Sequence, residues 1–298
     1  MMTEEDLDMT IDIAGAEAFL ATHGRQLDRR RLELLLGKGT AEGVLVALDG
    51  YRNADGGYGW GLEPDLRSRT SQPTAGMHAF EVFAEVGPAT TPRSIELCDW
   101  MQQHTLDDGG LPFALPYDDT AGCAPWWLDP DSETSNLQMT AQVVANALRV
   151  ARFDAGVAKH AWLARATRWC VDAIERLQEP HAYELLFAFR FADAYADVDD
   201  AALPLLEKLR GFLPDQGLMK VDGGNPDEVM RPLDFAPHAS SPARSMFADE
   251  IIAAELDRLA ARQEPDGGWT VEFSSSSPAS ALEWRGYATV AAVQILRD

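Results

Sequence analysis

Small and apolar residues recur at intervals of three and four along several stretches of the chain. One set is Ala79, Val82 and Phe83, and another is Val143, Ala147 and Val150. This spacing places the side chains on one face of a helix. The pattern predicts helices that begin at about Thr74, Thr140 and Ala281. Strand signals are confined to short runs such as residues 269–273, so the sequence predicts an all-α fold.

A glycine turn separates the predicted helices. The triplet Asp-Gly-Gly is closely followed by an aromatic residue three times, at residues 55–57, 108–110 and 266–268. A fourth triplet, at 222–224, lacks the aromatic residue. Glycine readily adopts the left-handed conformation that ends a helix, so each triplet predicts a tight reversal between two helices.

The spacing of the turns indicates a repeat. Gly56 and Gly109 are 53 residues apart, and Gly109 and Gly267 are 158 apart, close to three times that period. The period predicts two further turns, near residues 162 and 215. Residues 215–217 (Asp-Gln-Gly) fit the second position, whereas residues 161–166 show no turn.

Each clear copy consists of a helix, the turn, a loop and another helix, which is one helical hairpin per repeat. The chain has room for about six hairpins, enough to close an inner and an outer ring of helices, so we expect an α/α toroid. Apolar residues are spread evenly, and no linker composition interrupts them. The sequence therefore predicts a single domain over residues 1–298.

The segment from Gln263 to Trp269 (QEPDGGW) resembles the Gln/Trp repeat of squalene cyclases and the Gln-x-x-x-Gly-Gly-Phe repeat of prenyltransferase β subunits. Residues 103–113 are a looser copy, and residues 51–60 are another in which Arg52 replaces the glutamine. The chain is thus similar to small stand-alone bacterial members of the terpene cyclase and prenyltransferase superfamily. The resemblance implies a toroid that encloses an apolar, aromatic-lined cavity for an isoprenoid.

Relatives in this superfamily differ in how they initiate reaction. The Asp-x-Cys pair of the prenyltransferase zinc site and the Cys-Gly-Glu-Gln run of thioester proteins do not occur, and we expect no metal site. Asp197-Val198-Asp199-Asp200 matches the Asp-x-Asp-Asp acid motif of class II cyclases, which makes Asp199 a candidate acid. The alternative is that Asp199 or Asp200 caps the next helix, because the motif falls at the end of the ring opposite the glycine turns.

Residues that follow the glycine turns or begin the inner helices should share one rim of the ring. Five carboxylates fall there: Glu63, Asp65, Glu184, Asp234 and Glu283. Aromatic residues that could contact a substrate are Trp60, Trp126, Trp127, Tyr183, Phe187 and Trp284. A carboxylate beside aromatic surface has a raised pKa and can act as a general acid or base, so we predict that the five carboxylates include the catalytic acid and that Asp199 is the second choice.

The formal charge of -23 makes binding to nucleic acids or anionic membranes unfavourable. Three widely spaced cysteines fit a reducing compartment, and residues 1–8 lack the apolar core of a signal peptide. No apolar run is long enough to span a membrane, so we expect a cytoplasmic protein. The oligomeric state is open.

These observations favour an enzyme similar to the terpene cyclases, which cyclises or isomerises an apolar, isoprenoid-like substrate after protonation. One alternative is a non-catalytic toroid that binds a lipid or a partner protein. A second is a carbohydrate-active enzyme of the (α/α)6 type, since paired carboxylates and tryptophans also suit sugars. No cofactor is predicted, and Mg²⁺ is expected only if the substrate is a diphosphate.

Overall fold

The structure, a computed structural model, describes residues 11–89 and 91–298. Within these ranges it contains 13 α-helices, four 3-10 helices and one two-stranded sheet, which confirms the predicted all-α class. Residues 1–8, where we expect no signal peptide, lie outside the described residues. No helix in the described part of the chain is long and apolar enough to cross a membrane.

The first helices are α2 (Ile13–Thr22), α3 (Gln26–Leu35), α4 (Ala41–Leu48), α5 (Pro73–Val86), α6 (Pro92–His104), α7 (Leu137–Ala151) and α8 (Ala155–Ala158). The remaining helices are α9 (Ala161–Arg176), α10 (Ala182–Ala196), α11 (Leu203–Arg210), α12 (Pro232–Phe235), α13 (Asp249–Ala261) and α14 (Pro278–Arg297). The 3-10 helices are η1 (Asp49–Tyr51), η2 (Pro125–Trp127), η3 (Asp200–Ala202) and η4 (Pro242–Met246). Strands β1 (Met219–Lys220) and β2 (Val229–Met230) form an antiparallel hairpin.

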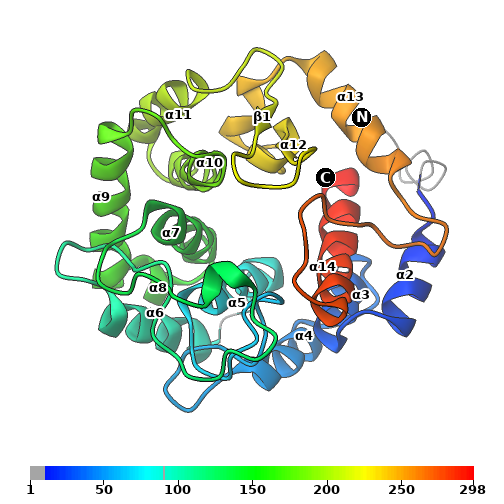
Figure 1. Cartoon of the computed structure of the whole chain (residues 1–298), viewed down its shortest axis with the longest axis horizontal. Helices are drawn as coiled ribbons and strands as arrows, with labels where there is room; N and C mark the ends of the chain where they lie inside the picture. The colour runs from blue at the N-terminus through cyan, green and yellow to red at the C-terminus, as the bar shows by residue number, and fades with distance from the viewer. Residues whose placement is uncertain (1–10, 90) are drawn as a thin grey trace.

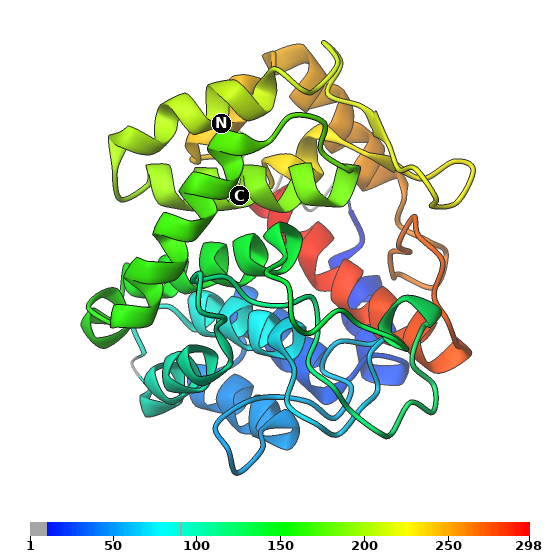
Figure 2. The ribbon, with the colours of Figure 1, turned by 60° about the vertical axis from the view of Figure 1, so that its left-hand side comes forward.

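Helices α5, α7, α10 and α14 face the centre of the molecule, and α6, α9, α11 and α13 lie behind them at the periphery (Figure 1). Helix α7 packs against α5, α10 and α9, and 11 of its 15 residues are buried. In the peripheral α13 only Ile252 and Ala260 are buried, because only one face has neighbours. The last helix, α14, contacts α2 and α3, so the two ends of the described chain meet (Figure 2).

The Asp-Gly-Gly turns connect peripheral helices to central ones. In all three copies the aspartate carboxylate accepts a hydrogen bond of 3.0–3.1 Å from the N–H of the second glycine, and the first glycine has a φ of 90° or more. Asp55 also accepts the indole N–H of Trp100 on α6 (3.1 Å), and Asp108 that of Trp169 on α9 (2.9 Å). The third copy bonds to Arg285 on α14 instead. Each turn is thus tied to another helix, which gives the repeated aspartate a structural role.

The turn predicted at residues 215–217 is present after α11, with a φ of 69° at Gly217, but other expectations are not met. Residues 161–166 begin α9, so the missing copy near residue 162 falls inside a helix. The triplet at 222–224 belongs to the β1–β2 hairpin, which explains why it is out of period. The run from Trp269 to Phe273 is not a strand, since the backbone N–H of Trp269 bonds to the Thr289 hydroxyl of α14 (3.0 Å) rather than to a neighbouring strand.

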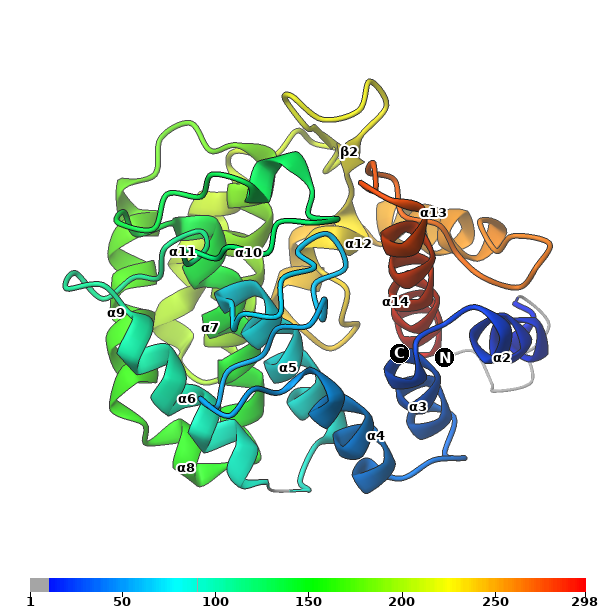
Figure 3. The same cartoon turned by 60° about the horizontal axis from the view of Figure 1, so that its bottom comes forward.

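Three connections gather at one edge of the molecule, over the central helices (Figure 3). They are the loop that contains η2, the β1–β2 hairpin, and the segment between α13 and α14. Side chains from all three line the same cavity, described next.

Candidate functional site

A cavity of about 1040 Å³ lies between the central helices and the three connections. Each of these helices turns a stripe of side chains toward it. On α5 the stripe includes Thr74, His78, Glu81 and Glu85, and on α7 it includes Gln138, Gln142, Asn146 and Arg149. On α10 it includes Tyr183, Leu186, Phe187 and Arg190, and on α14 it includes Trp284, Tyr287, Ala288 and Ala291. The stripes on α5 and α7 are polar, whereas those on α10 and α14 are mainly aromatic and apolar, so the cavity wall has both kinds of surface.

Eight of the predicted residues line this cavity. They are Glu63, Asp65, Asp234, Trp126, Trp127, Tyr183, Phe187 and Trp284. Four do not: Glu184, Glu283, Asp199 and Trp60.

Glu184 and Glu283 are each one residue from a cavity-lining aromatic residue, Tyr183 and Trp284 respectively. Successive helical residues point about 100° apart, so an inward aromatic side chain turns its neighbour away. Glu283 forms a two-pronged ion pair with Arg67, at 2.6 and 3.2 Å. Glu184 is half-buried, and burial raises its pKa. Neither carboxylate is therefore among the residues that line the cavity.

Asp199 is exposed at the start of η3, where its side chain accepts the backbone N–H of Ala201 at 2.9 Å. This is the capping role that we considered as the alternative to an acid motif. Trp60 lies in a separate surface pocket and is half-exposed; its indole donates to Asn53 (2.8 Å) and Arg69 lies over its ring. Neither residue contributes to the cavity.

Glu63 belongs to a buried network around His78. The ring Nε2 bonds to Glu63 at 2.9 Å and Nδ1 bonds to Glu81 at 3.2 Å, while the Tyr287 hydroxyl donates to Glu81 at 2.7 Å. Burial opposes a charge on the ring, but the two carboxylates outweigh it and raise the pKa of His78 to about 9. His78 is therefore a cation at neutral pH, and Glu63 is engaged as its counterion.

Asp65, in the loop before α5, is bonded to the segment before α14 and to α14 itself. One carboxylate oxygen accepts the Trp284 indole N–H at 2.7 Å, and the other accepts the backbone N–H and hydroxyl of Ser276 at 3.2 and 2.9 Å. Trp284 also lies edge-on to Phe273, with ring centroids 5.0 Å apart. With these bonds Asp65 holds an aromatic wall in place, as an acceptor rather than as a proton donor.

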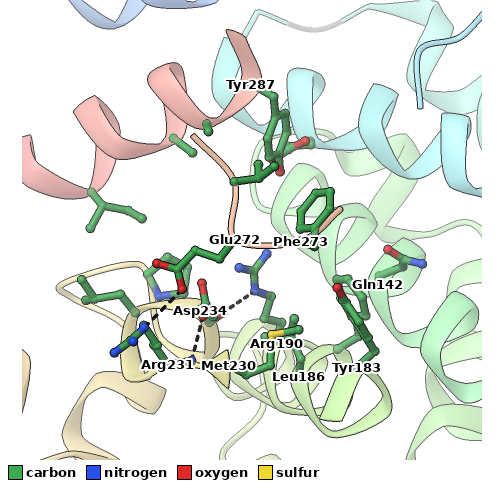
Figure 4. Close-up of a pocket in the computed structure, with 18 of the residues that line it drawn as sticks. Gln142, Tyr183, Leu186, Arg190, Met230, Arg231, Asp234, Glu272, Phe273 and Tyr287 are labelled. Carbon is green, nitrogen blue, oxygen red and sulfur yellow. Dashed lines mark hydrogen bonds and ion pairs between the residues drawn. The ribbon is translucent and has the colours of Figure 1, made fainter. Parts of the chain in front are cut away.

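Asp234 is the carboxylate that remains available. Its Oδ2 accepts the backbone N–H of Arg231 at 2.7 Å, and its Oδ1 has no hydrogen-bond partner among the residues described. Burial raises its pKa, which favours the protonated acid. Arg190 donates from Nε to the backbone carbonyl of Asp234 at 2.7 Å. Figure 4 shows Asp234 on one side of the cavity and Phe273, Tyr183 and Tyr287 toward the other.

Ion pairs line the wall next to Asp234. Glu272 bonds to Arg258, and also to Arg231 (3.3 Å) and Arg262 (3.2 Å). Nearby, the Tyr183 hydroxyl donates to the buried Glu228 at 2.7 Å. This wall is polar, but its charged groups are paired with one another. It can therefore form hydrogen bonds to a ligand, but among the described residues it offers no free acid or base.

The two adjacent tryptophans behave differently from each other. Trp127 is 6% exposed and stacks on Phe113 at 4.6 Å, whereas Trp126 is 49% exposed. Trp127 therefore fills the base of the loop, as a structural plug would, and Trp126 offers an aromatic face to solvent beside the cavity.

Sequence reasoning missed the cavity residues on the bodies of the central helices, among them His78, Glu81, Arg149 and Arg190. A signal was present: charged residues stood at helical spacing inside segments that were otherwise apolar or small. Helix starts and glycine turns mark only the rim of the ring, whereas these residues lie on the inner faces of the helices.

Within the described ranges, no group of three or more His, Cys, Asp or Glu side chains is placed to hold a metal ion. No protein-family model matches the chain, and no curated protein matches it. The proposed function is therefore inferred from the residues that line the cavity.

Proposed function

We propose that this chain is an α/α toroid whose cavity is the active site of an enzyme similar to the terpene cyclases. Six consecutive helix pairs support the toroid: α2–α3, α4–α5, α6–α7, α9–α10, α11–α12 and α13–α14. The central position of α5, α7, α10 and α14, and the contact between the last helix and the first two, fit a closed ring (Figure 1). The repeated turn at three of the junctions is consistent with this arrangement.

The observation that carries the enzymatic proposal is Asp234. A half-buried carboxyl group with a raised pKa and one unpartnered oxygen faces a cavity whose far side is aromatic. A protonated acid of this kind can transfer its proton to an alkene carbon, whose π electrons form the new C–H bond and leave a carbocation. The rings of Tyr183, Phe187 and Phe273 would stabilise that cation, which a second alkene captures before a proton returns to Asp234. The sequence is redox-neutral and amounts to isomerisation or cyclisation.

The test is turnover of linear isoprenoids by the full chain. Geranylgeraniol and squalene are suitable probes, with products followed by gas chromatography and mass spectrometry. Asp234→Asn should keep binding and lower kcat by about 100-fold or more, since it removes the proton but keeps the shape. Glu184→Gln is the matched control: it removes another partly buried carboxylate with a raised pKa, but one that faces away from the cavity. Equal turnover by wild type and Asp234→Asn would refute the assigned acid.

A carbohydrate substrate is the second candidate, and the polar wall favours it. Glu272, Glu228 and the Tyr183 hydroxyl offer hydrogen-bond partners that a hydrocarbon does not need. A panel of oligosaccharides in the same assay distinguishes the two. Binding of an isoprenoid without turnover would instead support the non-catalytic carrier.

A further inference from the structure

Two arginines on the cavity wall are less closely paired than the other cavity arginines. Arg231, Arg258 and Arg262 all pair with Glu272. Arg190, on α10, forms no ion pair with any described residue, and its one hydrogen bond goes to a backbone carbonyl. Arg149, on α7, reaches the Asn146 side chain at a long 3.4 Å and lies 3.7 Å from its nearest carboxylate oxygen.

Arg149 has a buried hydrogen-bond donor without an acceptor. Its Nη2 is shielded from solvent and has no hydrogen-bond partner among the described residues. Burial lowers the pKa of Arg149, Asp193 opposes this, and the charge of Arg190 lowers it further. Asp193, which lies 3.7 Å from Arg149, is about one helical turn after Arg190 on α10, so the two guanidinium groups lie near each other. A buried donor without an acceptor is destabilising, and more so when it carries charge.

A histidine completes the group. His238 lines the same cavity, and its ring forms no hydrogen bond within the described chain. Burial, then the charges of Arg149, Arg190 and Arg244, lower its pKa to about 3, and Arg149 and Arg190 line the same cavity as this ring. The ring is neutral at pH 7 and keeps one N–H donor.

We infer that Arg149, Arg190 and His238 bind an oxyanion, a carboxylate or phosphate group carried at one end of the ligand. Guanidinium groups suit such oxyanions because they present parallel N–H donors to two oxygens. This deepens the proposed function and depends on it for the apolar remainder of the ligand. Tyr183 and Phe187 lie on the same face of α10 as Arg190, and Tyr183 is about 10 Å away along the helix axis at 1.5 Å per residue. A ligand anchored at Arg190 would extend along this aromatic stripe past Asp234.

The experiment measures binding to the full chain by calorimetry, with dodecanoate, dodecyl phosphate and dodecanol as probes. We expect at least one anionic probe to bind about 10- to 100-fold more tightly than dodecanol, the range for hydrogen bonds to a charged group. Arg190→Gln should remove this preference and leave dodecanol binding unchanged. The carboxylate and phosphate arms show which oxyanion is preferred. Inorganic phosphate, tested alone, probes the anion site without the apolar chain.

Two variants keep the inference falsifiable. Arg152→Gln is the matched control, since Arg152 also lines the cavity but pairs with Asp197 at 3.1 Å, and it should leave the anion preference intact. Arg149→Gln removes one of the two guanidinium groups and should abolish the stabilisation by the anionic probes. Because it also leaves the buried Asp193 without its ion-pair partner, the midpoint of thermal unfolding without ligand should fall.

Equal affinity for charged and neutral probes, or an anion preference that survives in both Arg190→Gln and Arg149→Gln, would overturn the inference. Its failure is distinguishable from that of the proposed function. Anion binding that depends on Arg190, without turnover of any isoprenoid, would leave the oxyanion site standing and remove the cyclase. Turnover that depends on Asp234, without an anion preference, would support the cyclase and remove the oxyanion site.

Discussion

The buried network around His78 predicts how stability changes with pH. The ring donates to Glu63 and Glu81, and its pKa rises from the ordinary value of 6.5 to about 9. Because the folded protein binds this proton more tightly than the unfolded chain does, the stabilisation is fully present below pH 6.5 and is lost as the pH rises to about 9. At about 1.4 kcal/mol for each pKa unit, the loss is about 3 kcal/mol.

The assay is urea unfolding followed by far-UV circular dichroism at intervals between pH 6 and 9.5. Wild type should lose about 3 kcal/mol of unfolding free energy over this range from this one group. His78→Gln should be less stable at pH 6 and should show a flatter curve, because glutamine does not titrate. His104→Gln is the control, since that ring bonds to the Trp100 carbonyl and not to a carboxylate. Parallel curves for wild type and His78→Gln would refute the argument.

Two further predictions concern the glycine turns and the thiols. Gly267→Ala should destabilise the fold by several kcal/mol, because its φ is 90° and a Cβ would lie 2.2 Å from backbone atoms of α2. The control is Gly37→Ala, which should cost only about 1 kcal/mol, because its φ is 70° and a Cβ there would have nothing within 4 Å. Similar losses in thermal melts would contradict the close contact. In a thiol-labelling assay of native protein, Cys123 should react first, because burial raises the pKa of Cys98 and Cys170; early labelling of either would show that the core opens.

Much of the fold was visible in local pattern. The predicted helix starts at Thr74, Thr140 and Ala281 lie close to the observed starts at Pro73, Leu137 and Pro278. Helical periodicity and the left-handed conformation of glycine act over a few residues, so a sequence displays them directly. For the same reason, the rim residues Glu63, Asp65 and Asp234 were found from their positions after turns and at helix starts.

The chemistry of the site needed tertiary structure. Nothing local shows that Glu283 pairs with Arg67, that Asp65 binds the Trp284 indole, or that Arg190 forms no ion pair with a described residue. The first two contacts join residues more than 200 positions apart, and they form only when α14 meets the first helices. The third observation depends on which side chains surround Arg190 in the folded chain. The sequence alone determined the helical repeat and its turns. The packing of distant segments decided which carboxylates are neutralised and which faces of the helices enclose the cavity, because burial and charge compensation are properties of the assembled chain.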